Sequence, residues 1–547
     1  MLAQSLASTG ATALTFDWPG AGDAAGEAAD ADLDRWLDAA DLACETLRRR
    51  TGVRRLALIG QGFGAAVATR LAERRADIVQ LALLAPLVRG RVWLRELAVW
   101  GLIVAENLHL ERPTHASPTV AGYAVPPLLA GQVQSLDLTA EAAPRVAEIL
   151  IAARAARPLD NDYAAALRAK GRKVEVVPFE GYETLVSNPT EAYAPTDLMR
   201  SVTRFVASAM VKPRLGLAPG PTPEQPAVIS GGGFVEETLR LGEGRLIGVE
   251  CRPLAQQHAP RLLILNAGRD PREGWGRSST QMARALAREG VASLRIDGAD
   301  IGDSPAYPDG PASPLYTASL VRDAVHAIDF MLTRGEGPIV IYGRCSGAWA
   351  ALTTAFEDPR VSRVILANPR KYVVKPDEGV EAASEVMRYY RRRIAGRPLI
   401  KRLARREIDL RAVAARLSAS AAPLARSALG KSPTSAMLIR ERLDLLLRRG
   451  VDISIVVSDG SEAVGELNKR FGENGHKLRR WPNVRLNVIA RADHCFTQAR
   501  AQGELFTIVR DAVLDVASAG AEERARETAG RARFAFGSRL TTDARSA

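Results

Sequence analysis

A chain of 547 residues is too long for one hydrophobic core, so we expect at least two domains. Apolar residues make up 47% of the sequence and charged residues 25%, which argues against a disordered or fibrous chain. The formal net charge of +12 fits an anionic partner such as nucleic acid, anionic lipid or acidic glycan. The plainer explanation is a coding bias towards arginine and alanine.

Cysteine usage and the start of the chain indicate a reducing compartment. The four cysteines, Cys44, Cys251, Cys345 and Cys495, lack the close spacing of zinc sites and redox motifs, so we expect no metal and no cofactor. The first residues lack a basic region before an apolar run. The longest lipid-like stretch, residues 97–105, is far shorter than the roughly 20 residues of a spanning helix. We therefore expect a cytoplasmic protein, with peripheral contact to the inner membrane as an alternative.

The first predicted elements belong to a parallel sheet. A helix that ends at Gly10 leads into a short apolar strand over residues 11–15, which runs into FDWPGAGD at residues 16–23. A second apolar run, residues 56–59, enters the glycine-rich turn at residues 60–64. Such alternation of helices and short buried strands is typical of parallel sheets.

A linker separates these elements from a second region. Five prolines between residues 213 and 226 disfavour a helix, so we predict a linker over residues 211–232. Beyond it, residues 234–241 and 246–253 are predicted to form a hairpin, and residues 261–266 a third strand.

The second region repeats the first. We therefore expect a duplicated domain, with copies at residues 1–210 and 233–518 and a disordered polar tail at 519–547. The first copy lacks a counterpart of the strand at 261–266 and of the loop after it. Three collinear matches carry the repeat: residues 16–23 with 296–303, residues 60–64 with 343–347, and Ala85-Pro86 with Asn368-Pro369.

The turn Gly343-Arg344-Cys345-Ser346-Gly347 has the pattern of a nucleophile elbow. A strand precedes it, and the alanine-rich segment 348–355 predicts a helix after it. Gly343 and Gly347 provide the small flanks that so tight a turn requires. Cys345 stands at the nucleophile position.

Two partners for this thiol follow in the chain order nucleophile, acid, histidine. The predicted strand at residues 453–458 ends at Asp459, and the strand at 486–489 runs towards His494. We expect Cys345 to attack as a thiolate, the histidine to accept its proton, and the aspartate to fix the imidazole tautomer.

The predicted oxyanion hole consists of the backbone N–H of Ser346 and one from Ala267 or Gly268. Plainer roles stay open for the triad. Cys345 is alternatively a small buried residue, Asp459 a turn or helix cap, and the histidine a surface residue.

The first copy lacks the parts of a triad. Gly62 stands at its nucleophile position, and Glu180-Gly181-Tyr182 occupies the place of the histidine. Asp160 or Asp162 fits the acid position, with nothing to orient. We expect no triad chemistry in this copy.

We predict a helical cap insertion in each copy. In the second copy it spans residues 371–450 and is strongly basic around Arg391, Arg392 and Arg393. This cluster is either a solvated face of the cap or a site for an anionic glycan, a lipid head group or a phosphate-bearing carrier. No nucleic-acid-binding module accompanies it, so we expect no nucleic-acid partner.

With these motifs in hand, the chain resembles the α/β-hydrolases associated with the exosortase A system and exopolysaccharide gene clusters. The second copy is similar to one type of that family at residues 343–347, Asn368-Pro369 and 389–393. The first copy is similar to another type at residues 85–91 and Gly181-Tyr182. The resemblance implies two α/β-hydrolase-like domains, the first one degenerate, and a role in exopolysaccharide metabolism.

Together these features predict a hydrolase or acyltransferase that acts on an acyl ester or thioester through Cys345, His494 and Asp459. The expected partners are a small acyl substrate or an acylated glycan or carrier, and a second copy of the chain in a homo-oligomer. The alternative is a non-catalytic hydrolase-like scaffold, or a protein that binds glycans or a membrane surface during polysaccharide assembly.

Overall fold

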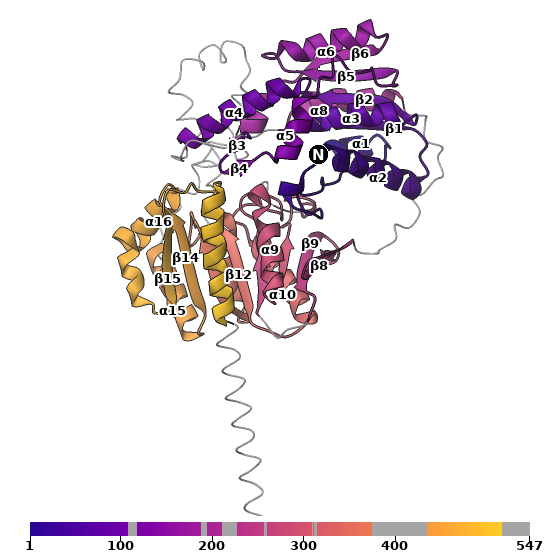
Figure 1. The fold of residues 1–547 in the computed structure, drawn as a ribbon. Coiled ribbons are helices and arrows are strands. Elements are labelled where there is room, and N and C mark those ends of the chain that lie inside the picture. The colour runs from indigo at the N-terminus through magenta and orange to yellow at the C-terminus, as the bar shows by residue number, and fades with distance from the viewer. Residues whose placement is uncertain are drawn as a thin grey trace, which may run out of the picture. The chain divides into compact units, whose positions relative to one another are not determined.

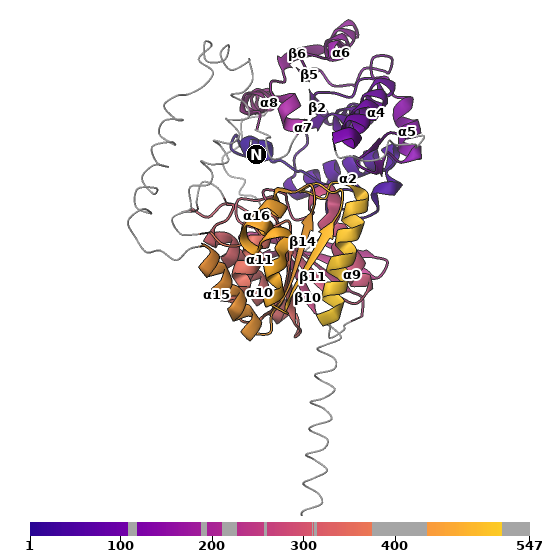
Figure 2. The ribbon, with the colours of Figure 1, turned by 90° about the vertical axis from the view of Figure 1, so that its left-hand side faces the viewer.

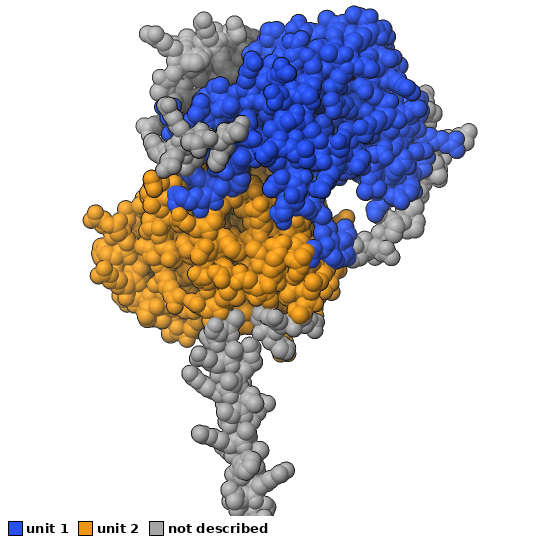
Figure 3. All heavy atoms as spheres, viewed as in Figure 1, with its two compact units in different colours: residues 1–231, 498–500 blue, residues 232–497, 501–547 orange. Residues whose placement is uncertain are grey.

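A computed structural model describes residues 1–107, 117–187, 194–209, 227–255, 260–308, 310, 314–374 and 435–516. The chain forms two compact units, coloured separately in Figure 3: residues 1–231 with 498–500, and residues 232–497 with 501–547. The predicted cluster at Arg391, Arg392 and Arg393 and the predicted tail lie outside the described residues.

The first unit is built on a four-stranded parallel sheet with the order β1-β2-β5-β6 (Figure 1). The central strands consist of aliphatic residues that are completely buried, such as residues 149–152. The strands are β1 (Leu56–Gln61), β2 (Ile78–Leu84), β5 (Glu148–Ala153) and β6 (Lys173–Pro178). The helices around them are α1 (Leu2–Ala7), α2 (Leu33–Thr51), α3 (Phe63–Arg74), α6 (Pro158–Ala169), α7 (Tyr182–Ser187) and α8 (Thr196–Ser208).

The expected insertion of the first copy lies between β2 and β5. It contains α4 (Gly90–Asn107), the small hairpin β3 (Thr119–Val120) and β4 (Tyr123–Ala124), and α5 (Pro127–Gln134). Although α4 carries the apolar stretch noted in the sequence, no helix within the described residues is long and apolar enough to cross a membrane.

The predicted strand at residues 11–15 is wrong. These residues have no regular secondary structure and are mostly exposed. In the second unit, the matching strand β11 (Ala292–Ile296) pairs in parallel with β10 (Arg261–Ile264). The described part of the first unit contains no counterpart of β10, so a strand here has no such neighbour for its backbone hydrogen bonds.

The second unit is built on a nine-stranded sheet with the order β15-β14-β13-β12-β10-β11-β9-β8-β7, whose edge strand β7 precedes residue 232. The strands from β11 to β15 in this order are parallel, whereas β9 pairs antiparallel with β11 and with β8. The predicted hairpin is confirmed as β8 and β9, and β7 falls within the predicted linker. The remaining bounds are β7 (Val228–Gly231), β8 (Phe234–Leu241), β9 (Leu246–Pro253), β12 (Ile339–Arg344), β13 (Val361–Ala367), β14 (Asp452–Ser458) and β15 (Val484–Ile489).

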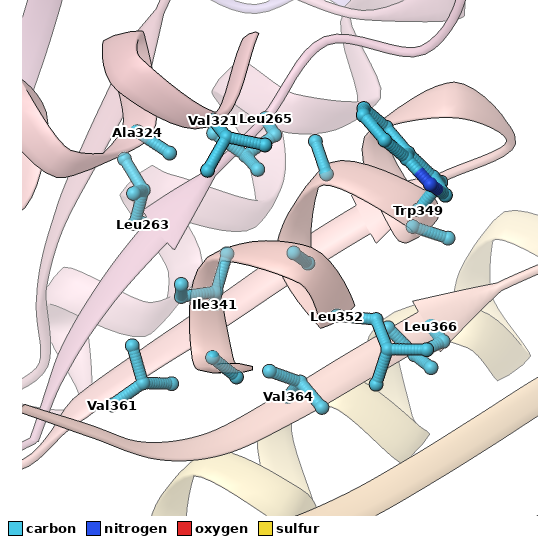
Figure 4. Packing of buried hydrophobic residues seen from close by; sticks show 14 of the residues in the cluster. Leu263, Leu265, Val321, Ala324, Ile341, Trp349, Leu352, Val361, Val364 and Leu366 are labelled. Atoms are coloured by element: carbon cyan, nitrogen blue, oxygen red, sulfur yellow. The ribbon is translucent and has the colours of Figure 1, made fainter. Parts of the chain in front are cut away.

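Helices cover both faces of this sheet, as Figure 2 shows. On one face, side chains such as Leu263, Ile341 and Val364 from the strands pack against Ala324 and Leu352 from the helices (Figure 4). On the other face, α9 packs with the helical residues 501–516. The helices are α9 (Ser278–Arg288), α10 (Ala318–Thr333), α11 (Ser346–Glu357), α15 (Ser435–Arg448) and α16 (Glu462–Phe471), with 3-10 segments at Trp275–Arg277 and Glu473–Arg480.

The end of the predicted cap belongs to this core. Ile439, Leu443 and Leu446 of α15 are buried in the main hydrophobic cluster of the unit. Their spacing of four and three residues places them on one face of a helix, which packs against α11. Residues 435–448 are therefore a covering helix of the sheet, and residues 375–434 of the predicted cap lie outside the described structure.

The duplication is visible in the geometry of both units. The parallel order β1-β2-β5-β6 has its counterpart in β12-β13-β14-β15. In the first unit the Asp17 carboxylate accepts a hydrogen bond of 3.0 Å from the backbone N–H of Asp23. In the second unit Asp297 accepts from Asp303 at the same distance.

Candidate active site

The turn after β12 has the backbone geometry of a nucleophile elbow. Cys345 lies between the last residue of β12, Arg344, and the first residue of α11, Ser346. Its φ of 55° and ψ of −114° are backbone angles that residues other than glycine rarely adopt. Such a turn raises the side chain above the carboxyl edge of the sheet, next to a helix N-terminus that favours negative charge.

Steric limits explain the two elbow glycines. A Cβ at Gly343 would lie 2.1 Å from the carbonyl oxygen of Gly347. A Cβ at Gly347 would lie 2.3 Å from the carbonyl oxygen of Asn266, just after β10. Both distances are far below van der Waals contact, so strand, turn and helix approach this closely only with glycine at both positions.

Cys345 is partly exposed, and its sulfur lies 3.8 Å from the hydroxyl oxygen of Tyr316. The Tyr316 ring packs edge-on against Trp349, with ring centroids 5.8 Å apart. Burial raises the pKa of the Cys345 thiol, while the Tyr316 hydroxyl and the charges of Arg370 and Arg344 oppose that rise. The net shift is upward, so the protonated thiol predominates at neutral pH.

His494 lies in the loop after β15 and is held neutral. Its Nδ1 lies 2.7 Å from the Ser461 hydroxyl oxygen, and its Nε2 is buried without a hydrogen-bond partner among the described residues. Burial, together with the charges of Arg370 and Arg344, lowers the pKa of His494 to about 4. The same two guanidinium groups act on Cys345, so thiol and imidazole share one electrostatic environment.

Asp459 lies at the end of β14, as predicted, but no hydrogen bond joins its carboxylate to His494 in the described structure. The side chain is exposed and accepts from the backbone N–H of Ala492 at 3.3 Å. Backbone N–H groups, that of Arg491 foremost, lower the pKa of Asp459. The group at the imidazole is Ser461, whose hydroxyl also caps α16.

The predicted oxyanion residues meet at the elbow. The backbone N–H of Gly268 donates to the Ser346 hydroxyl at 2.9 Å, which joins the loop after β10 to α11. The Ser346 backbone N–H acts on the Cys345 thiol and favours its negative charge. Ala267 precedes Gly268 on the same loop. In this conformation the Ser346 side chain engages the Gly268 N–H.

Asn368, the residue after β13, fixes the loop that carries the histidine. Its amide nitrogen donates to the Ser458 hydroxyl at 2.8 Å and to the His494 carbonyl at 2.9 Å. Its amide oxygen accepts from the Ser458 backbone N–H at 2.8 Å. Ser458 in turn donates to the Asp493 carbonyl at 2.9 Å. This buried network ties the ends of β13 and β14 to the His494 loop.

Two partly buried ion pairs fix the loop after β10. The Asp297 carboxylate accepts from the backbone N–H of Arg272 at 2.7 Å and from its guanidinium at 2.5 Å. Arg344, directly before the nucleophile position, donates to Asp270 at 2.5 Å. The candidate oxyanion loop is therefore held at both β11 and the elbow.

The first unit keeps the elbow backbone without the chemistry. Gly62 has φ 56° and ψ −115°, nearly the same angles as Cys345. Asp160 is fully buried and pairs with Arg154 at 2.8 Å, so it is not aimed at a histidine. In the described parts of both units, no group of three or more His, Cys, Asp or Glu side chains could hold a metal ion.

Comparison with known families agrees with this geometry. Residues 1–157 match the family described as serine aminopeptidase, S33, and residues 262–506 match the α/β hydrolase family. The chain contains two α/β-hydrolase regions. No curated protein matches the chain.

The solved structures that match the chain share little sequence with it. A cold-adapted esterase from an Arctic intertidal metagenomic library is 16% identical, with 52% of this chain and 96% of that chain covered and a TM-score of 0.31. An alpha-beta serine hydrolase homologue from Coxiella burnetii is 14% identical, with 53% and 97% covered and a TM-score of 0.29. Alpha/beta hydrolase domain-containing protein 10 from mouse is 15% identical, with 53% and 99% covered and a TM-score of 0.29.

Sequence reasoning missed three residues around the thiol and the imidazole. Ser461 precedes a helix, which is the position of an N-cap, and this signal was available in the sequence. The sequence around Tyr316 contains no motif that marks it as a site residue. The role of Asn368 depends on contacts with residues 458 and 494, which are distant in sequence.

Proposed function

We propose that the second α/β-hydrolase region is an acyl ester or thioester hydrolase, or an acyltransferase, with Cys345 as nucleophile and His494 as base. The observation that carries this proposal is the elbow conformation of Cys345. The charges of Arg344 and Arg370 act on this cysteine and on His494, a partly buried, neutral histidine whose buried Nε2 has no hydrogen-bond partner among the described residues. Both features are what nucleophilic catalysis requires.

The reaction begins from a neutral pair rather than from a thiolate–imidazolium pair. The thiol sulfur forms a bond to the acyl carbon while its proton passes to His494 Nε2. The tetrahedral intermediate then expels the alcohol or thiol, which takes that proton. Water hydrolyses the acyl-cysteine, or an acceptor hydroxyl takes the acyl group.

Ser461 supports this proposal as the partner of Nδ1. A hydroxyl that accepts from Nδ1–H leaves Nε2 free to act as base. Asp459 is the acid expected from its place in the chain. We propose that its exposed carboxylate moves towards the imidazole during the reaction. The Ser346 and Ala267 N–H groups are the proposed oxyanion donors, and Gly268 joins them once its N–H is released by the Ser346 side chain.

The proposed substrate class rests on the resemblance to exopolysaccharide-associated hydrolases. An acylated glycan or carrier fits that setting. Arg391, Arg392 and Arg393 are the proposed contacts to an anionic glycan or to the inner-membrane surface, on the basis of their sequence alone. The proposed location is the cytoplasm.

The test is turnover of a panel of nitrophenyl esters and acyl thioesters by the full chain. Cys345→Ala should lower kcat/KM at least a thousandfold, because the acyl-enzyme can no longer form. Cys44→Ala, in α2 of the first unit, is the matched control and should retain activity. Unchanged turnover in Cys345→Ala would exclude this function.

A second candidate function is a non-catalytic scaffold. Two features favour it: burial raises the pKa of the Cys345 thiol, and the Ser346 hydroxyl engages the Gly268 N–H. Incubation with an acyl ester or thioester discriminates between the two functions. A catalytic Cys345 should carry a hydroxylamine-sensitive acyl group after acid quenching, whereas a scaffold should carry none.

A further inference from the structure

One expected donor of the oxyanion hole in the second unit is already engaged. The backbone N–H of Gly268 donates to the Ser346 hydroxyl at 2.9 Å. The groups that act on the Cys345 thiol include the Ser346 backbone N–H and the hydroxyl of Tyr316. A side-chain hydroxyl next to the nucleophile can serve as an oxyanion donor in the same way as a backbone N–H.

The Tyr316 hydroxyl lies at the reacting atom. Its oxygen is 3.8 Å from the Cys345 sulfur, a distance at which a hydroxyl can form a hydrogen bond with sulfur. A thiol S–H is a weak donor, so the phenol is the better donor of this pair. Together with the Ser346 N–H, two donors therefore converge on the sulfur.

The same hydroxyl also reaches the oxygen of a reacting acyl group. Once the acyl carbon is bonded to the sulfur, its oxygen lies two bonds from the sulfur. From the other side, an O–H···O⁻ hydrogen bond spans about 2.5–2.7 Å. These two lengths together exceed the 3.8 Å between sulfur and hydroxyl, so one oxygen atom can contact both without a movement of the tyrosine ring.

The Tyr316 ring is held on two sides. It packs edge-on against Trp349, with centroids 5.8 Å apart, and the Lys371 ammonium lies 4.6 Å from its centroid. The backbone N–H of Trp349 donates to the Cys345 carbonyl, so this indole and the nucleophile share one turn of α11. The Tyr316 backbone has a φ of 57°, which residues other than glycine rarely adopt. Such strain is most common at functional sites.

We propose that Tyr316 is a catalytic residue whose hydroxyl donates to the oxyanion while the Gly268 N–H stays engaged. This inference rests on the proposed function and adds a residue to it. The sulfur lone pair forms the C–S bond, the π pair of the carbonyl moves onto its oxygen, and the thiol proton passes to His494. Tyr316 keeps its proton. When the C=O bond forms again, the bond to the leaving group breaks, and the leaving group takes the proton from His494.

Tyr316→Phe removes the hydroxyl and keeps the ring contacts. Because loss of one oxyanion donor is costly, kcat of the full chain should fall about a hundredfold, with little change in KM. Tyr372→Phe is the matched control. Its hydroxyl is buried without a hydrogen-bond partner among the described residues, so kcat should be unchanged. Full activity in Tyr316→Phe, with Cys345→Ala inactive, would overturn the role of the tyrosine and leave the proposed function intact.

A readout without turnover is the addition of trifluoroacetone to the full chain, followed by ¹⁹F NMR. Attack by the Cys345 thiol forms a hemithioketal, whose hydroxyl ionises readily in an oxyanion hole. Tyr316→Phe should weaken the binding of this ketone about tenfold and shift the ionisation to higher pH. Cys345→Ala should form no adduct. The same ionisation in wild type and Tyr316→Phe would overturn the proposal, and no adduct in wild type would overturn it together with the nucleophile.

Discussion

At the scale of single residues, burial keeps both proposed reacting groups neutral. The pKa of His494 falls to about 4, and the pKa of the Cys345 thiol rises. An imidazole with so low a pKa is a weak base, but it stays unprotonated over the whole range in which most hydrolases work. The proposed hydrolase should therefore keep its activity down to about pH 5.

The same shift makes stability depend on pH. The unfolded chain binds a proton at His494 near pH 6.5, whereas the folded chain does so only near pH 4. The stabilisation that the neutral His494 side chain provides is therefore fully present above pH 6.5, and it is lost as the pH falls towards 4. Between pH 7 and 5 the free energy of unfolding should fall by about 2 kcal/mol from this residue.

Urea unfolding of wild type and His494→Gln at both pH values measures this effect. The variant should lack that part of the pH dependence. His476→Gln, at an exposed histidine of the second unit, should retain it. Identical pH dependence in wild type and His494→Gln would show that the imidazole is not buried in its neutral form.

Ser461 is expected to position the imidazole. A neutral hydrogen bond contributes about 1 kcal/mol, so Ser461→Ala should lower kcat about fivefold, with little change in KM. Ser461→Asp keeps an acceptor and an N-cap, and its charge should move the acid limb of the pH–rate profile to higher pH. A purely structural role predicts no movement of that limb.

The sequence was sufficient for the elbow and for the loop of the histidine, because each follows a recognisable strand. The sequence was not sufficient to predict which side chain contacts Nδ1 of His494. Asp459 and Ser461 are two residues apart, and only the direction of the turn between them decides which one reaches His494. That direction depends on backbone contacts with residues 491 and 492, which no local pattern encodes.

At the scale of elements, the four strands of the first sheet match β12 to β15, and the described part of the first unit contains no counterpart of β10 or of the loop after it. Gly347 in the second unit approaches Asn266 at the end of β10, whereas its counterpart Gly64 has no atom within 4 Å of an added Cβ. The second elbow glycine is therefore a steric necessity in one copy and not in the other, whereas the first, Gly60 or Gly343, is required in both.

A matched pair of substitutions tests this difference. Gly347→Ala should destabilise the second unit by about 1–3 kcal/mol, because the elbow helix must move away from β10. Gly64→Ala should be neutral or stabilising by up to about 1 kcal/mol, because alanine favours the helix. Thermal unfolding compares the two variants, and equal losses would contradict the steric account.

Missing neighbours also explain where prediction from sequence failed. Residues 11–15 have the apolar pattern of a strand but no counterpart of β10 beside them. Residues 435–448 belong to the covering layer of the sheet rather than to a cap, since their apolar face packs into the core. Both errors concern tertiary partners, which a local pattern does not specify.

At the scale of the whole molecule, one elbow carries a thiol and the other a glycine. We therefore propose that Cys345 alone carries out bond-making chemistry. The most direct test of this proposal is to mix the full chain with a nitrophenyl ester or acyl thioester that it turns over, quench with acid, and map the acyl group by peptide mass spectrometry. The predicted result is a hydroxylamine-sensitive acyl adduct on the Cys345 peptide, and on none of the peptides with Cys44, Cys251 or Cys495. Continued turnover with an adduct at another residue, or with the same rate in Cys345→Ala, would contradict it.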